Sequence, residues 1–201
     1  ILSGLVGSEM CIRDSYFMIG TRLNADRKVN IRPTKLQFGF NCLNNRPAPH
    51  RILLGYRLFE SNLLDRVLFT QSAWDSMEAD IFNSLPNFKT YKQLLPIALP
   101  DSNDGEDARS KGPLVYHHSF YNSYCNIVTE TETEEVPYTN KLDLENVTEK
   151  SYKPFIAKQV PLILGCRGHI AYLKGLGFEM MEDLLPLGYD QMWTEQKITA
   201  I

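Results

Sequence analysis

The sequence lacks several features that would assign a function class directly. It has no uninterrupted apolar run of the roughly 20 residues that a membrane helix needs. Its formal net charge of -3 provides no basic field to attract a nucleic-acid backbone. It also contains neither an Asp-x-Asp metal motif nor the Gly-x-Ser-x-Gly motif of serine hydrolases. We therefore predict a chain without a membrane span, a nucleic-acid partner or a bound metal.

Cysteine is also scarce, with four residues among 201. Cys11 lies in an unusual N-terminal segment, and the other three, Cys42, Cys125 and Cys166, are widely separated. An odd number without metal-ligand spacing favours neither a disulfide framework nor a zinc site. We expect reduced thiols, which are typical of a cytosolic (cytoplasmic) protein.

The N-terminal segment LVGSEMCIRDS, residues 5–15, has no helical or strand period and no basic start of the kind that opens a secretory signal. It matches the in-frame translation of a common sequencing adapter, so residues 1–15 are expected to be read-through. Residues 16–34 are expected to be a linker or the remnant of an upstream domain. One domain is expected over residues 35–201, which is long enough to bury a core.

Within residues 35–201, short apolar segments of strand type alternate with amphipathic segments of helix type. Strands are expected at 35–41, 67–71, within 121–130 and at 161–166, and helices from Pro49, over 76–85, after Thr148 and over 167–178. The segment PLILGC at 161–166 is nearly all apolar, which is typical of a strand buried on both faces of a parallel sheet. This alternation predicts an α/β fold, with a Rossmann-like parallel sheet, flanking helices and ligands at the carboxyl ends of its strands.

Polar residues that follow the predicted strands are the candidates for binding. They are Asn44, Asn45, Arg46, His50 and Arg51 after the first strand, and Thr148, Glu149 and Lys150 at the start of a later helix. A helix N-terminus beside a lysine suits a diphosphate, an adjacent carboxylate can accept from ribose hydroxyls, and an arginine adds a planar donor fork. From spacing alone, a capped helix with exposed charges and a surface ion pair are the simpler interpretations.

Two segments add a family resemblance. NVTEKSYKPFIAKQVPLILG is similar to the donor-binding segment of the fucosyltransferase family that includes the α-1,3-fucosyltransferases, and KLQFGFNCLNNRPAPHRILLGYRLF is similar to that family's strand, loop and Arg-led helix. The pattern Thr-Glu-Lys-Ser-Tyr-Lys-Pro, followed by Leu-Gly-Phe at 176–178, resembles more closely fucosyltransferase-like proteins of marine viruses and bacteria. The resemblance covers roughly residues 35–189.

This resemblance implies a GT-B glycosyltransferase, of which the chain would be the C-terminal half. It implies that Glu149 contacts the ribose of a nucleotide-sugar donor such as GDP-fucose, that Lys150 and Arg51 contact the diphosphate, and that Glu130 helps to hold the sugar. Thr148 completes this donor-binding segment. The acceptor would be a glycan hydroxyl, and no other cofactor is implied. The general base is expected in an N-terminal domain, so this part alone is expected to bind donor weakly and to transfer nothing.

Two alternatives stay open. A non-catalytic carbohydrate- or nucleotide-binding module, part of a viral structural protein, would share the same fold. A hydrolase site at His117 and His118 is a weaker alternative, because no nucleophile motif accompanies them. His169, after a glycine-containing loop, is expected either to reach the ligand site or to cap a helix.

Overall fold

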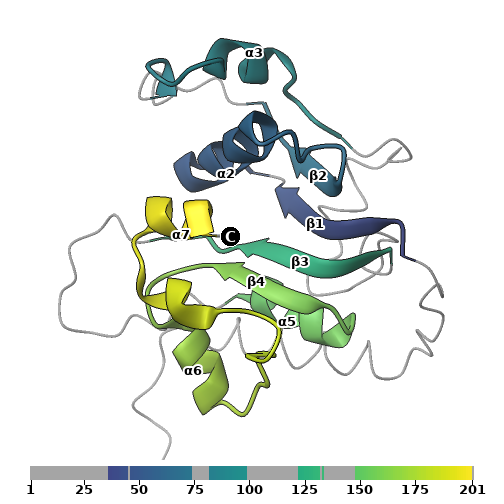
Figure 1. Cartoon of the computed structure of the whole chain (residues 1–201), viewed down its shortest axis with the longest axis vertical. Coiled ribbons are helices and arrows are strands. Elements are labelled where there is room, and N and C mark those ends of the chain that lie inside the picture. Colours follow the sequence, from purple (N-terminus) through teal and green to yellow (C-terminus); the bar gives the residue numbers. More distant parts are fainter. Residues whose placement is uncertain are drawn as a thin grey trace, which may run out of the picture.

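The computed structural model describes residues 36–44, 46–73, 82–98, 122–131, 133 and 148–200, without the side chain of Glu149. These residues contain a four-stranded sheet in the order β2-β1-β3-β4, and all its strand pairs are parallel (Figure 1). The predicted α/β class, with a Rossmann-like parallel sheet flanked by helices, is confirmed. Residues 1–35, the candidate Asn45, most of the expected helix at 76–85, and His117 and His118 lie outside the described residues.

The strands and helices alternate along the chain much as the sequence pattern predicts. The strands are β1 (Phe38–Asn44), β2 (Val67–Gln71), β3 (Ser123–Thr129) and β4 (Val160–Leu164). The helices are α2 (Pro49–Glu60), α3 (Phe88–Gln93), α5 (Glu149–Ile156), α6 (His169–Gly175), the 3-10 helix η4 (Leu187–Gln191) and α7 (Thr194–Ala200). Asn44, expected in a loop, is instead the last residue of β1.

Side chains that alternate along the strands build a separate apolar cluster on each face of the sheet. On one face, Leu162 and Leu164 of β4 pack with Leu54 of α2 and Ile198 of α7. On the other face, Ile163 packs with residues of α5, α6 and η4. Because both faces are covered, the strands are apolar on both sides, as expected for a parallel sheet.

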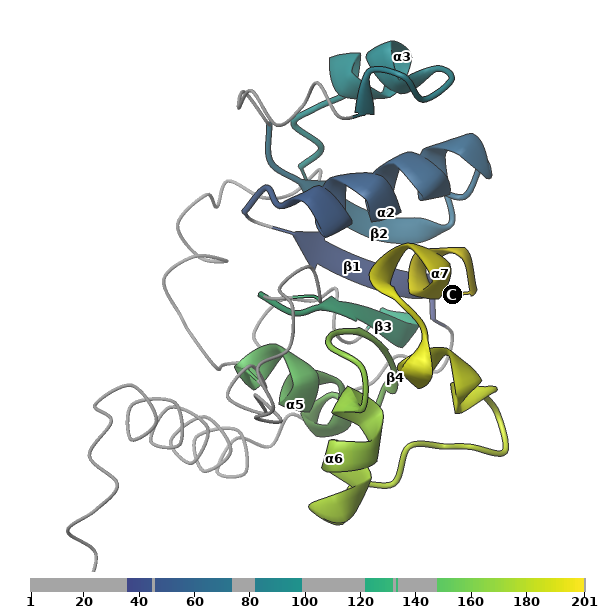
Figure 2. The same ribbon diagram turned by 90° about the vertical axis from the view of Figure 1, so that its left-hand side faces the viewer.

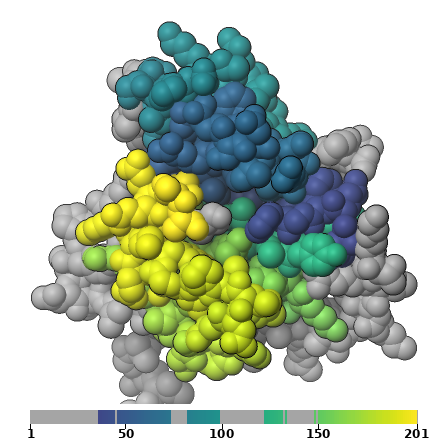
Figure 3. All heavy atoms as spheres, in the orientation of Figure 1, coloured from purple at the N-terminus to yellow at the C-terminus, as the bar shows by residue number. Residues whose placement is uncertain are grey.

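The last helix, α7, was not predicted, and it completes the layer that α2 begins. The C-terminal residues lie directly against α2 on the face shown in Figure 3. Arg57 of α2 forms an ion pair with Glu195 of α7 at 3.8 Å. At one end of the molecule, α3 packs on the outer side of α2, whereas α5 and α6 lie at the opposite end (Figure 2).

The order of the strands creates a topological switch point between β1 and β3. From β1 the chain crosses to β2 on one side, and later returns to β3 on the other side. The neighbouring strands β1 and β3 are therefore followed along the chain by strands on opposite sides of them, β2 and β4, an arrangement that commonly forms a ligand site at the carboxyl edge. Among the described residues, no helix is both long and apolar enough to cross a membrane.

Candidate functional site

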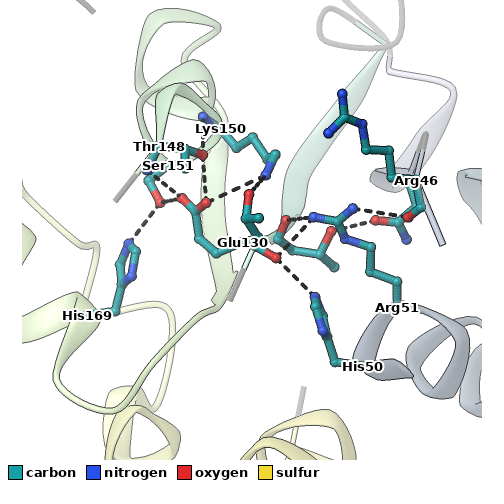
Figure 4. Close-up of polar contacts among 11 residues, drawn as sticks. Arg46, His50, Arg51, Glu130, Thr148, Lys150, Ser151 and His169 are labelled. Atoms are coloured by element: carbon teal, nitrogen blue, oxygen red, sulfur yellow. Dashed lines mark hydrogen bonds and ion pairs between the residues drawn. The ribbon is translucent and has the colours of Figure 1, made fainter. Parts of the chain in front are cut away.

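Glu130, the first residue after β3, lies at the centre of a polar network at the carboxyl edge (Figure 4). Its side chain is fully buried. One carboxylate oxygen, Oε1, accepts from the Thr148 backbone N–H at 3.2 Å and from the Ser151 hydroxyl at 2.6 Å. The other oxygen accepts from the Thr148 hydroxyl at 2.6 Å and lies 3.7 Å from the Lys150 ammonium. These partners compensate for the desolvation of a buried charge.

The helix start predicted at Thr148 is confirmed, and its donors have partners within the chain. Thr148 is the N-cap of α5, and its hydroxyl oxygen accepts from the Lys150 backbone N–H at 3.4 Å. Its own backbone N–H donates to Glu130. The expected attraction of this helix start for anions is thus partly satisfied by Glu130. The expected ribose contact of Glu149 involves a side chain outside the described part.

Lys150 presents its positive charge at the border of the network. Its Nζ donates to the Thr131 hydroxyl at 2.8 Å, and its side chain is 31% exposed, whereas the Glu130 side chain beside it is 0% exposed. A partly exposed ammonium can exchange a protein partner for a ligand oxygen at small cost. Lys150 is therefore the cation of this group that is best placed to meet a diphosphate.

Arg51 has a different environment, because backbone carbonyls surround its guanidinium. Nη1 donates to the carbonyl of Arg46 at 3.0 Å, and Nη2 donates to those of Thr129 and Glu130 at 3.3 Å and 3.1 Å. The residue is only 6% exposed, and burial is the main cause that lowers its pKa. In this arrangement Arg51 ties the loop after β1 to the end of β3, and its expected contact with a diphosphate stays a prediction.

His50 reinforces the same connection between α2 and β3. Its Nε2 donates to the Glu130 carbonyl at 3.0 Å, since a carbonyl oxygen can only accept. Burial, followed by the charge of Arg51, lowers the pKa of His50 to about 4, so the ring is neutral at pH 7. Beside it, the Thr129 hydroxyl donates to the Asn44 side-chain oxygen at 2.5 Å, which links the ends of β3 and β1.

The structure brings Arg51, Glu130, Thr148 and Lys150 into one network, although they come from three separate segments of the sequence (Figure 4). The alternative that His169 caps a helix is wrong, because the N-cap of α6 is Gly168. His169 instead reaches this network through Ser151, a contact that sequence reasoning missed. Ser151 donates to Glu130, and the His169 Nε2 lies 2.8 Å from the Ser151 hydroxyl oxygen. The sequence signals were the position of Ser151 three residues after the N-cap and that of His169 after a glycine-containing loop.

Within the part of the chain that the structure describes, no group of three or more His, Cys, Asp or Glu side chains is arranged to hold a metal ion. The three described cysteines, Cys42, Cys125 and Cys166, are free. Comparison with protein-family models, curated proteins and solved structures gave no match. The site's own chemistry and the motif resemblance are therefore the grounds on which a function can be proposed.

Proposed function

We propose that the carboxyl edge of the sheet binds the diphosphate of a nucleotide-sugar, and that the chain carries the donor-binding domain of a GT-B glycosyltransferase. The observation that carries this proposal is the placement of three cationic residues, Arg46, Arg51 and Lys150, at the switch point between β1 and β3, where Glu130 is the described carboxylate among them. The chain as a whole has a formal net charge of -3. A local excess of cations at the position where such sheets bind ligands favours an anionic ligand.

In this proposal Lys150 contacts the phosphate that leaves with the nucleoside. Negative charge grows on that phosphate as an acceptor hydroxyl attacks the anomeric carbon of the sugar. A positioned ammonium stabilises this charge more in the transition state than in the ground state. The Thr131 hydroxyl, which already contacts Lys150 at 2.8 Å, is a second polar group beside the same phosphate.

The nature of the donor and acceptor comes from the motif resemblance alone. It favours GDP-fucose as donor and a glycan hydroxyl as acceptor, with Glu149 on the ribose and Arg51 on the diphosphate. Buried, hydrogen-bonded Glu130 then acts on the donor through Lys150 and the start of α5. The free cysteines are compatible with a cytosolic setting.

Calorimetric titration of the purified chain with GDP, GDP-fucose, UDP and ADP tests this proposal. We expect GDP and GDP-fucose to bind, and Lys150→Ala to weaken their affinity about tenfold, the loss of one charge-assisted contact. Lys174→Ala is the matched control. Lys174 belongs to α6, is 48% exposed and forms an ion pair with Glu182. Equal effects of both substitutions, or no nucleotide binding by a folded chain, would overturn the proposal. Equal affinity for all four compounds would favour the non-catalytic binding module.

A further inference from the structure

A buried chain of hydrogen bonds connects α6 to Glu130 through α5. His169 is the first residue of α6, and its Nε2 lies 2.8 Å from the Ser151 hydroxyl oxygen. That hydroxyl lies 2.6 Å from Glu130 Oε1. Ser151 is 0% exposed and His169 is 4% exposed, so neither residue contacts a ligand from this position. In Figure 4, His169 and Ser151 lie on the side of the Glu130 carboxylate that is opposite to Arg51.

The direction of these hydrogen bonds follows from the chemistry of the groups. An ionised carboxylate can only accept, so the single Ser151 proton is donated to Glu130. The Ser151 oxygen must then accept from His169, which requires a proton on Nε2. Nε2 carries that proton both in one neutral tautomer and in the imidazolium ion. The hydrogen bond to Ser151 therefore requires an N–H group at Nε2, whether or not the ring is charged.

The surroundings hold the His169 ring in a defined place. A Cβ at Gly165 would lie 2.7 Å from the ring's Nδ1, so the absence of a side chain there makes room for the ring. Asp190 accepts from the backbone N–H groups of Ile170 and Ala171 at 3.1 Å and 3.3 Å, which fixes the start of α6. The charges of Glu130, Asp190 and Lys197, which follow β3 or belong to η4 and α7, act on the pKa of the ring.

We propose that His169 and Ser151 are positioning residues for the carboxyl-edge site. Through one directed pair of hydrogen bonds they orient the Glu130 carboxylate, and that carboxylate holds the first turn of α5 and the Lys150 ammonium in place. The link to ligand affinity depends on the proposed function. The structural role, in which the Nε2–H group of His169 orders the start of α5, does not depend on the proposed function.

Two substitutions of similar size separate this role from simple packing. His169→Gln keeps an N–H donor near the Nε2 position, whereas His169→Leu fills a similar space without one. A residue that only packs in a site 4% exposed would tolerate leucine better than glutamine. A positioning role predicts the opposite order. Ser151→Ala removes the hydroxyl that links His169 to Glu130, and it adds no volume.

15N NMR of the ligand-free chain locates the His169 ring proton, and amide hydrogen exchange at residues 150–152 then measures the order of the start of α5. We expect a protected proton on Nε2 that is lost in Ser151→Ala. We also expect exchange at the start of α5 to become about tenfold faster in His169→Leu and Ser151→Ala, but to remain near wild type in His169→Gln. A ring proton on Nδ1 alone, or leucine matching or exceeding glutamine, would overturn the inference.

GDP affinity, measured on the same four proteins, separates this inference from the proposed function. If the wild type binds GDP, affinity should follow the order wild type, His169→Gln, then His169→Leu. Unchanged affinity in His169→Leu would overturn the positioning role while leaving the donor site intact. If no form binds GDP, the proposed function fails, and the NMR and exchange results still decide the inference.

Discussion

The groups on the two sides of Glu130 contact different parts of this residue, its backbone carbonyl on one side and its carboxylate on the other. On the side of α2, which we call the α2 corner, His50 and Arg51 donate to backbone carbonyls, including that of Glu130. On the side of α5, the α5 corner, Thr148, Lys150 and Ser151 surround the Glu130 carboxylate. One corner depends on the course of the main chain, and the other depends on a single ionised side chain. The α2 corner should therefore tolerate substitution of Glu130, and the α5 corner should not.

Glu130→Gln should have the largest effect. The amide keeps the shape of the side chain, but its NH₂ group replaces a carboxylate oxygen that accepts hydrogen bonds in the wild type. The substitution also removes the negative charge beside Lys150. We expect the free energy of unfolding to fall by about 3 kcal/mol, as for the breaking of a buried charged network. Urea denaturation measures this change. Glu195→Gln is the matched control, because Glu195 is 74% exposed in an ion pair at 3.8 Å, and it should change stability by less than about 0.5 kcal/mol.

Hydrogen exchange in Glu130→Gln then tests whether the corners are separate. Protection should be lost at the start of α5 but retained at the start of α2, where His50 and Arg51 still meet the carbonyl of residue 130. Equal loss at both helix starts would mean that the two corners form one cooperative unit, and the comparison would fail.

Arg51→Lys should produce the next largest effect, in the α2 corner. The substitution keeps the positive charge but removes the planar fork that reaches the carbonyls of Arg46, Thr129 and Glu130. We expect a loss of about 2 kcal/mol in the free energy of unfolding, because buried carbonyls lose donors. Arg57→Lys, in the same helix but with a side chain 41% exposed, should be close to neutral. Equal effects of the two substitutions would contradict the role assigned to the fork.

The parts that sequence reasoning predicted are those set by local pattern. Val67–Gln71 forms the expected strand, Pro49 begins α2, and Thr148 caps α5, because apolar runs, a helix-start proline and an N-cap act within a few residues. Lys197 shows what local pattern misses. A lysine is normally expected at the surface, yet Lys197 is 1% exposed and donates to the Gly165 and Cys166 carbonyls.

The same limit applies to the site. Lys150 was a candidate because it follows a recognisable helix cap, whereas the roles of Ser151 and His169 depend on where α5 and α6 meet. Likewise, Arg51 was expected to face a ligand, and only the tertiary structure brings the loop carbonyl of Arg46 and the end of β3 around its guanidinium. Pairings between residues far apart in the sequence are set by packing, which periodicity does not encode.

The last expected effect is similar in size to that of Arg51→Lys and concerns pH, because His50 contributes to the α2 corner as a neutral ring. The folded-state pKa of His50 is about 4, mainly because the ring is buried, whereas an unperturbed histidine has a value of 6.5. Between these values the unfolded chain binds a proton that the folded chain does not, so this residue's contribution to stability is lost as pH falls. From pH 6.5 to pH 4.5 the loss should be about 2 kcal/mol.

His50→Gln isolates this contribution, because glutamine keeps a donor for the Glu130 carbonyl but does not titrate. Urea denaturation of both proteins at several pH values between 7 and 4.5 measures it. Carboxylates and the buried His169, whose pKa is also lowered by burial, titrate in both proteins, and their effects cancel in the difference. The variant should therefore gain about 2 kcal/mol relative to wild type as pH falls. Parallel curves would mean that His50 binds its proton as readily in the folded chain as in the unfolded chain, and that a second cation beside Arg51 donates to the Glu130 carbonyl.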